Sequence, residues 1–169
     1  MPIDLHPAAL DETTLLTNCD IRRQRRSGPG GQHRNKVETA IVISHRATGV
    51  TGEASERRSQ EENRRRALLR LRVNLALAVR MPSANAAPSD VWQTRCRGGK
   101  IRVNPEHAEF PQLLAEALDV LHDCEMDISA AAQRLGCTSS QLVKFLQRES
   151  RALEQVNQRR DQLGRRRLR

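Results

Sequence analysis

One glycine-rich segment has the residue types and spacing best suited to chemistry in this chain. Residues 27–32 read Ser-Gly-Pro-Gly-Gly-Gln, and residues 33–36 continue without a break as His-Arg-Asn-Lys. Three glycines around one proline favour neither helix nor strand, and ordering them costs backbone entropy. Glycine lets backbone amides approach a ligand closely, and flanking cations can hold phosphates. A plain surface loop would account for the glycines but not for the cations, so the pattern favours a loop that faces RNA.

Two common nucleotide-binding motifs do not fit this chain. A dinucleotide fingerprint that began at Gly28 would need a glycine where His33 stands, and a helix after the loop. A phosphate-binding loop that ended in Gly99-Lys100 would need a glycine where Thr94 stands. It would also need a hydroxyl residue in place of Ile101. The sequence therefore supports neither NAD nor ATP, and we expect no cofactor.

The cysteines and the N-terminal residues bear on metal binding and on location. No C-x-x-C pair occurs, and His122-x-Cys124 is the only close pair of metal-ligand types, so we expect ordinary buried or half-buried side chains and no metal site. The cysteine spacing favours reduced thiols in a cytoplasm. The first twenty residues contain four acids and no Lys or Arg, and no run of 18 apolar residues occurs. A membrane span and the usual targeting peptides are therefore disfavoured.

Positive charge is concentrated in the middle of the chain. Residues 21–80 contain 15 Lys+Arg and 5 Asp+Glu, in a protein whose formal net charge is +9. Residues 22–36 contain six cations and no acid. Such a segment attracts a polyphosphate, because each neutralised phosphate releases counterions. A solvated basic face is the alternative, but the missing acids favour nucleic acid. The three aromatic residues are too sparse for base stacking, so binding should depend on phosphates and shape.

The first hundred residues are expected to form a small sheet and one long helix. Residues 8–17 predict a short helix or turn, and the β-branched residues of 37–44 predict a strand. A turn at 47–49 leads to a second strand at 50–54. Ser59 and Glu62 have the spacing of a capping box, and leucines at helical spacing follow it, which predicts a helix of about twenty residues. The helix should end near Pro82, where a linker over 82–88 begins.

The rest of the chain is expected to be largely helical. Residues 91–103 predict one more strand or hairpin, added to the first domain. Amphipathic helices are predicted over 110–121, 128–135 and from about 139 to 148, and the Gly136 turn between the last two has a helix-turn-helix outline. Residues 110–150 carry a net charge of −3, and cations of the second helix are limited to Lys144 and Arg148. A structural or docking module is therefore favoured over a DNA reader, which stays open.

These expectations define a fold class and a domain organisation. The fold class is α+β, with a small mixed sheet that carries the glycine-rich loop and a packed long helix, followed by a small helical, helix-turn-helix-like module. The expected domains are 1–104 for the sheet and long helix, 105–158 for the helical module and 159–169 for a basic C-terminal tail. Residues 158–169 contain few apolar residues to bury, so we expect their deletion to spare the fold.

Residues 18–80 resemble a known family. They are similar to the catalytic domain of class I peptide chain release factors and to the short, codon-independent ribosome-rescue peptidyl-tRNA hydrolases. The resemblance is carried by the motif of residues 27–36 with Gly30-Gly31-Gln32 at its centre. It is also carried by Thr39, His45 with Thr48-Gly49, Glu56-Arg57-Arg58-Ser59-Gln60 and Asn63-Arg64.

The resemblance implies hydrolysis of the peptidyl-tRNA ester in the peptidyl transferase centre. Gly30, Gly31 and Gln32 would be the catalytic residues: the Gln32 backbone N–H would stabilise the transition state, its side chain would position water, and the glycines would permit the loop's backbone angles. The implied partners are large-subunit ribosomal RNA and P-site peptidyl-tRNA, bound by a monomer. Gln32 is also a candidate for methylation by a glutamine methyltransferase. The implied RNA-binding residues are Arg22, Arg23, Arg25, Arg26, His33, Arg34, Asn35, Lys36, Arg57 and Arg58.

The chain also departs from the pattern of codon-reading factors. We expect no decoding domain within 169 residues, which favours codon-independent release or ribosome rescue. Short rescue proteins of the family carry a basic tail that contacts the mRNA channel, and residues 159–169 are a brief candidate for such a contact. Helices over 110–150 stand where a plain linker is usual. The alternative is a non-catalytic RNA- or DNA-binding regulator that keeps the Gly-Gly-Gln loop.

Overall fold

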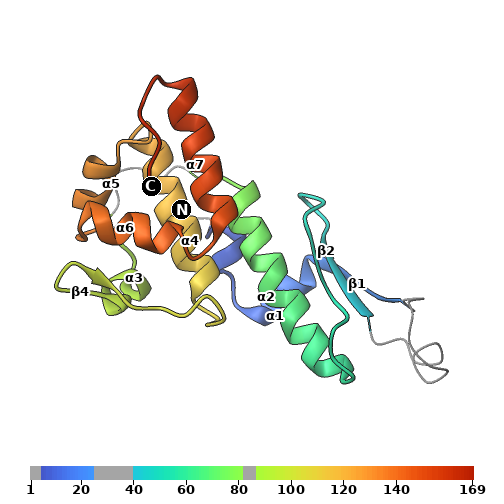
Figure 1. Ribbon diagram of the computed structural model, residues 1–169. Coiled ribbons are helices and arrows are strands. Elements are labelled where there is room, and N and C mark those ends of the chain that lie inside the picture. Colours follow the sequence, from blue (N-terminus) through green and yellow to red (C-terminus); the bar gives the residue numbers. More distant parts are fainter. Residues whose placement is uncertain (1–4, 25–39, 82–86) are drawn as a thin grey trace. The chain divides into compact units, whose positions relative to one another are not determined.

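The described part of the chain contains two groups of short antiparallel strands and seven α-helices (Figure 1). The computed structural model describes residues 5–24, 40–81 and 87–169. It divides into two compact units, Met1–Ala78 and Val79–Arg169. The α+β fold class is thereby confirmed. The domain limits at 104 and 158 stay predictions. No described helix combines the length and the hydropathy needed to cross a membrane.

The first unit contains a three-stranded antiparallel sheet in the order β1-β2-β3. The predicted hairpin is confirmed where it is described, and residues 37–39 of the predicted strand lie outside the described residues. The predicted short helix of 8–17 is divided into two pieces. The elements are η1 (Pro7–Ala9), α1 (Glu12–Thr17), β1 (Cys19–Gln24), β2 (Ala40–His45), β3 (Thr51–Ala54) and α2 (Gln60–Ala78).

Helix α2 packs on one face of this sheet. Alternate residues of a strand point to the same face, so Ile41 and Ile43 lie on the helix side, where they are 3% and 0% exposed. Leu71 and Leu75 of α2 are fully buried, as the helical spacing predicts. The helix lies close to Gly52, where a Cβ atom would lie 2.3 Å from the Leu71 amide nitrogen. This close approach fixes β3 against the helix.

The second unit contains a β-hairpin and five helices. The helix-turn-helix outline is confirmed: Gly136 has φ +65° between the last two predicted helices, and the Thr138 side chain accepts from the Gln141 amide at the start of the second. The hairpin, which the sequence predicts as an addition to the first domain, instead forms a separate two-stranded sheet within the second unit. The elements are α3 (Asp90–Arg95), β4 (Cys96–Arg97), β5 (Lys100–Ile101), α4 (Phe110–Asp123), α5 (Ile128–Arg134), α6 (Ser139–Leu146) and α7 (Ser150–Gln162).

The aromatic residues form the centre of the second unit. Trp92, Phe110 and Phe145 are each at most 1% exposed. The Phe145 ring centroid lies 5.8 Å from that of Trp92 and 5.5 Å from that of Phe110. The Trp92 indole N–H donates to the Leu135 carbonyl at 2.7 Å, which fastens α3 to the end of α5. Because all three rings are internal, none offers a surface on which a base could stack.

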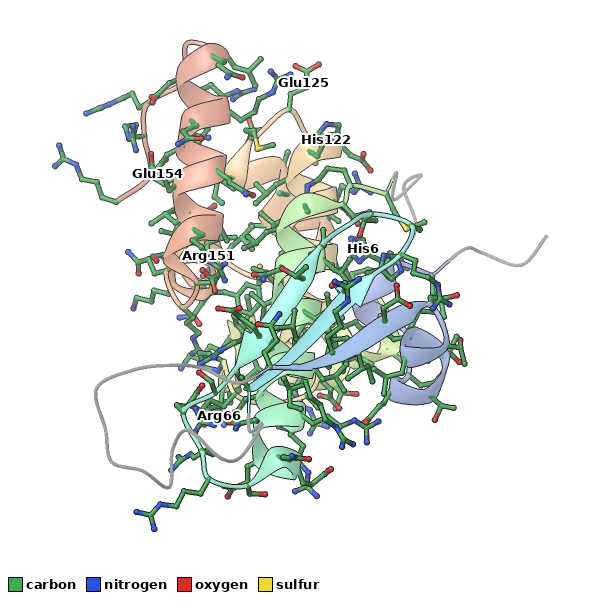
Figure 2. The ribbon with its side chains drawn as sticks, turned by 90° about the vertical axis from the view of Figure 1, so that its right-hand side faces the viewer. His6, Arg66, His122, Glu125, Arg151 and Glu154 are labelled. Atoms are coloured by element: carbon green, nitrogen blue, oxygen red, sulfur yellow. The ribbon has the colours of Figure 1, made fainter. Side chains whose placement is uncertain are left out.

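The C-terminal residues fold back along α7. The Asn157 side chain donates to the Leu168 carbonyl at 3.0 Å and accepts from the Leu168 amide at 2.7 Å. The Arg160 guanidinium is buried and donates to the carbonyls of Arg166 and Met126. Arg167 bridges to Glu154 of α7, labelled in Figure 2, at 2.7 Å. The tail is thus held to the second unit by polar contacts, while the effect of its removal stays a prediction.

Candidate functional site

The glycine-rich segment joins two strand ends that are paired with each other. Gln24 ends β1, Ala40 begins β2, and the two residues are register partners. The connection between them is therefore residues 25–39. The predicted site residues of this connection lie outside the described residues: Arg25, Arg26, Gly30, Gly31, Gln32, His33, Arg34, Asn35 and Lys36. The described chain fixes the two points from which the segment departs.

Two of the predicted RNA-binding arginines lie on β1, at the edge of the sheet. Arg22 is the register partner of Val42, and Arg23 is the register partner of Ile41. Neighbouring strand residues point to opposite faces, so these two arginines lie on opposite faces of the sheet. Both are exposed, and neither guanidinium bonds to a described residue. The strand thus offers free positive charge on both faces just before Gln24.

Arg57 and Arg58 lie in the turn between β3 and α2, which Asn63 holds in place. Asn63 is fully buried; its Oδ1 accepts from the Arg57 amide at 3.0 Å and its Nδ2 donates to the Arg57 carbonyl at 2.9 Å. The Ser59 hydroxyl accepts from the Glu62 amide at 3.3 Å, which confirms the Ser59 part of the predicted cap. Both guanidinium groups are exposed and bond to no described residue. Asn63 therefore holds the backbone of the turn, while the guanidinium groups of Arg57 and Arg58 bond to no described residue.

A salt-bridge network fixes the same turn to α2, and the sequence analysis did not assign it. Glu56 lies 2.6 Å from Arg70 and 3.3 Å from Arg66, which Figure 2 labels. The Ser55 amide donates to Glu56 at 2.9 Å. Partial burial alone would raise the pKa of Glu56, but the backbone amides and the Arg70 guanidinium outweigh it and lower the pKa to about 2. The sequence carries no direct signal for it, because Glu56 precedes α2 and lies outside the i,i+4 spacing at which helical ion pairs are read.

The remaining arginines of α2 also bond within the protein. Arg65 lies 3.2 Å from Glu61, and Arg64 lies 4.0 Å from Glu12 of α1. Arg72 donates to the Ala8 carbonyl at 3.1 Å. The helix is therefore not a row of free cations, although its sequence is rich in arginine. In this unit the unbonded positive charge of the described residues is found on β1 and in the turn before α2.

The strand ends and the turn line one shallow hollow. Its walls come from the end of β1, the first residues of β2, the end of β3, the turn and α2. The lining residues are Gln24, Ala40, Ile41, Val42, Glu53, Ala54, Ser55, Glu56 and Arg70. The Glu56 network thus lies beside the two strand ends from which residues 25–39 depart. The Glu56 network therefore gives residues 25–39 a rigid base at the points where they leave the sheet.

His45, which is part of the resemblance to the family, holds the turn between β2 and β3. Its Nδ1 lies 2.9 Å from the Thr48 hydroxyl, across the turn that Gly49 completes with φ +71°. Burial, and then the neighbouring Arg46 charge, lower the pKa of the imidazole, so it is neutral at pH 7. The cysteines are likewise internal or partly internal: Cys19 is buried, and the other three are half-buried.

The comparisons with known proteins agree on one family. Residues 14–106 match the model described as the RF-1 domain. Peptide chain release factor 1 of Acidiphilium cryptum is 38% identical over 86 residues, which are 50% of this chain and 24% of that protein. Peptide chain release factor 1 of Xylella fastidiosa is 48% identical over 84 residues, 50% of this chain and 21% of the relative.

A chloroplast relative matches a shorter segment more closely. Peptide chain release factor PrfB1, chloroplastic, of Arabidopsis thaliana is 52% identical over 58 residues, or 34% of this chain and 13% of the relative. This chain thus spans less than a quarter of the length of each of these three relatives. No solved structure matches.

Proposed function

Because this chain belongs to the RF-1 domain family, which its residues 14–106 match, we propose that it hydrolyses the ester bond of peptidyl-tRNA on the ribosome. One observation carries the proposal: the Gly30-Gly31-Gln32 sequence lies inside the matched region, in the connection between the paired ends of β1 and β2. The two hydrogen bonds from Asn63 to Arg57 and the Glu56 salt-bridge network support the proposal, since they give that connection a rigid base. The reaction takes place in the cytoplasm.

The proposed reaction consumes one water molecule. The water oxygen attacks the ester carbonyl carbon and forms a tetrahedral intermediate, which then releases the ribose oxygen of the tRNA. The protons of the water end on that ribose oxygen and on the new peptide carboxyl group. The Gln32 backbone N–H donates to the oxygen that gains negative charge, and the Gln32 side chain positions the water. No side chain acts as a general base in this scheme, and His33 contacts RNA.

Ribosome binding depends on the cations that the fold leaves unbonded. Arg22, Arg23, Arg57 and Arg58 are exposed and free of intramolecular partners among the described residues, so they can approach ribosomal RNA phosphates without breaking a salt bridge. The cations of residues 25–36 add to them. The arginines of α2 are tied to Glu12, Glu56 and Glu61, and they contribute less.

The finer proposals concern the state of the ribosome. Release is independent of a stop codon, as the resemblance of residues 18–80 to short rescue proteins suggests. The C-terminal tail contacts an mRNA channel that holds no message, in which case long messages compete with it. Gln32 is methylated by a glutamine methyltransferase, which mass spectrometry of the protein from its own cells tests directly.

The deciding experiment measures peptide release from ribosomes that carry peptidyl-tRNA, with a stop codon, a sense codon or no codon in the decoding site. We expect release in all three cases. Gly31→Ala should abolish release and keep ribosome affinity within about twofold, because the loop angle is lost while the cations stay. A wild-type chain that binds ribosomes and RNA but releases no peptide would instead be the regulator that retains a Gly-Gly-Gln loop.

The charges are tested with a matched pair of variants. Arg57→Gln with Arg58→Gln removes two unbonded cations, and Arg64→Gln with Arg65→Gln removes two that are already paired. The first variant should weaken ribosome binding and flatten its salt dependence by about 2 in slope, since each phosphate contact contributes about 0.9. The second should change the slope by less than half as much. Equal effects would refute the assignment of binding to the unbonded cations.

A further inference from the structure

The hairpin of the second unit presents three cations on its outer face. Gly98 and Gly99 have φ values of +56° and +74°, which form the tight turn of a two-residue hairpin loop. Arg97 and Lys100 are register partners and so lie on the same face. Residues alternate between faces of a strand, so Arg102 shares the face of Lys100. The residues on the opposite face, Ile101 and Val103, are 4% and 6% exposed.

Two hydrogen bonds connect the hairpin to the residues that flank α6. The Thr138 amide, at the start of α6, donates to the Gly99 carbonyl at 3.3 Å. The Arg148 guanidinium, just after the end of α6, donates to the Val103 carbonyl. Four extended residues span about 13 Å and the eight residues of α6 span about 12 Å, so the strand and the helix match in length. Lys144 of α6 is exposed as well and is included with the hairpin cations in the tests below.

The charges of this surface are not neutralised by any residue that the structure describes. Arg97, Lys100, Arg102 and Lys144 form no ion pair or side-chain hydrogen bond with a described residue. Other cations of the unit do: Arg80 with Asp119, Arg95 with Glu109, Arg134 with Asp123, Arg151 with Glu149, and Arg165 with Asp127. The four cations are named the hairpin patch below.

We propose that the hairpin patch binds the phosphate backbone of a double-stranded RNA segment. A row of cations with no acidic partner suits phosphates, whose neutralisation releases counterions. A duplex is favoured over a single strand because Trp92, Phe110 and Phe145 are internal and leave no ring for stacking. RNA is favoured over DNA because the same chain carries a release-factor domain. The net charge of −3 over residues 110–150 conceals this surface, since three of its cations precede that range.

The test measures binding of the full chain to an RNA duplex of about 20 base pairs and to the DNA duplex of the same sequence, by fluorescence anisotropy over a salt series. The hairpin variant combines Arg97→Gln, Lys100→Gln and Arg102→Gln. A control variant removes three cations that already have ion-pair partners, through Arg64→Gln, Arg65→Gln and Arg151→Gln. Urea unfolding followed by Trp92 fluorescence shows that both variants stay folded.

The hairpin variant should bind RNA at least tenfold more weakly and lower the salt slope by about 2 to 3. Three phosphate contacts contribute a loss of about 40-fold in RNA affinity when the salt concentration rises from about 50 to about 200 mM. The hairpin variant should lack this part of the salt dependence. Lys144→Gln alone should lower the slope by about 1.

Three results would overturn the proposal: an unchanged slope, an equal loss in the control variant, or tighter binding to DNA than to RNA. The inference does not depend on hydrolysis, since the Gly31→Ala chain should show the same dependence on the hairpin patch.

Discussion

Replacing Asn63 with alanine should loosen the first unit and leave the second unit unchanged. The side chain is fully buried and makes one hydrogen bond to the Arg57 amide and one to the Arg57 carbonyl. Each such bond contributes about 1 kcal/mol net, and a buried group left without a partner costs about 1–3 kcal/mol more. The Arg57 backbone lies at the surface, where water can replace the lost bonds in part. We therefore expect a loss of about 2–3 kcal/mol in the free energy of unfolding of that unit.

Hydrogen exchange measures this loss because it reports each unit separately. In Asn63→Ala, amides of β2 and α2 that exchange by global opening of the first unit should exchange about 30- to 150-fold faster, the factor that 2–3 kcal/mol corresponds to. Trp92 lies in the second unit, so its fluorescence during urea unfolding should keep the same midpoint. Asn74→Ala is the matched control, because Asn74 lies on the same helix and donates to the Thr51 carbonyl at 2.7 Å. It should cost about 1 kcal/mol.

The same variant links the turn to function. If Asn63 holds Arg57 and Arg58 in their places, Asn63→Ala should also weaken ribosome binding at a temperature where the chain is still folded. Equal exchange rates in the variants of Asn63 and Asn74 would refute the reasoning, because the two bonds to one residue would then add nothing beyond an ordinary surface contact.

Other substitutions test the packing around the site. Gly52→Ala should destabilise the first unit by about 3 kcal/mol or more, measured by urea unfolding with far-UV circular dichroism, since its Cβ would lie 2.3 Å from the Leu71 amide nitrogen. Glu56→Gln should lower the free energy of unfolding by about 1 kcal/mol at pH 7, a value that allows for solvent screening of the partly exposed ion pair with Arg70. Because the pKa of Glu56 is lowered in the folded state, the wild-type chain should lose this stability as the pH falls from about 4.5 to about 2. The variant should show no such loss. Deletion of residues 163–169 should lower the unfolding midpoint of the second unit, followed by Trp92 fluorescence; an unchanged midpoint would restore the view of a dispensable tail.

The regular elements could be predicted because their signals are local. The alternation around Ile41 and Ile43, the leucine spacing of α2 and the Gly136 turn each depend on a few neighbouring residues, and each is confirmed. The partner of a strand is a non-local property. Residues 96–101 have the turn chemistry of a hairpin, but nothing in their sequence indicates that they pack along α6 and not on the first sheet.

Polar contacts were the least predictable part of the site and of the tail. Nothing in the motif Glu56-Arg57-Arg58-Ser59-Gln60 says which charges bond internally and which stay free. The structure shows that Glu56 bonds to α2 while the two arginines bond to no described residue. In the tail, the number of apolar residues did not indicate how the segment is held. Asn157 and Arg160 bond to its backbone carbonyls and amides.

Whether an arginine is already ion-paired decides how much it can contribute to nucleic-acid binding in this protein. An ion pair must be broken before its arginine can neutralise a phosphate, so a paired cation contributes less to counterion release than an unpaired one. Residues 57–72 contain seven arginines, but Glu12, Glu56 and Glu61 engage four of them and a backbone carbonyl engages Arg72. The remaining two precede α2, beside the hollow at the strand ends. The salt dependence of binding should therefore follow the number of unpaired cations and not the net charge of +9.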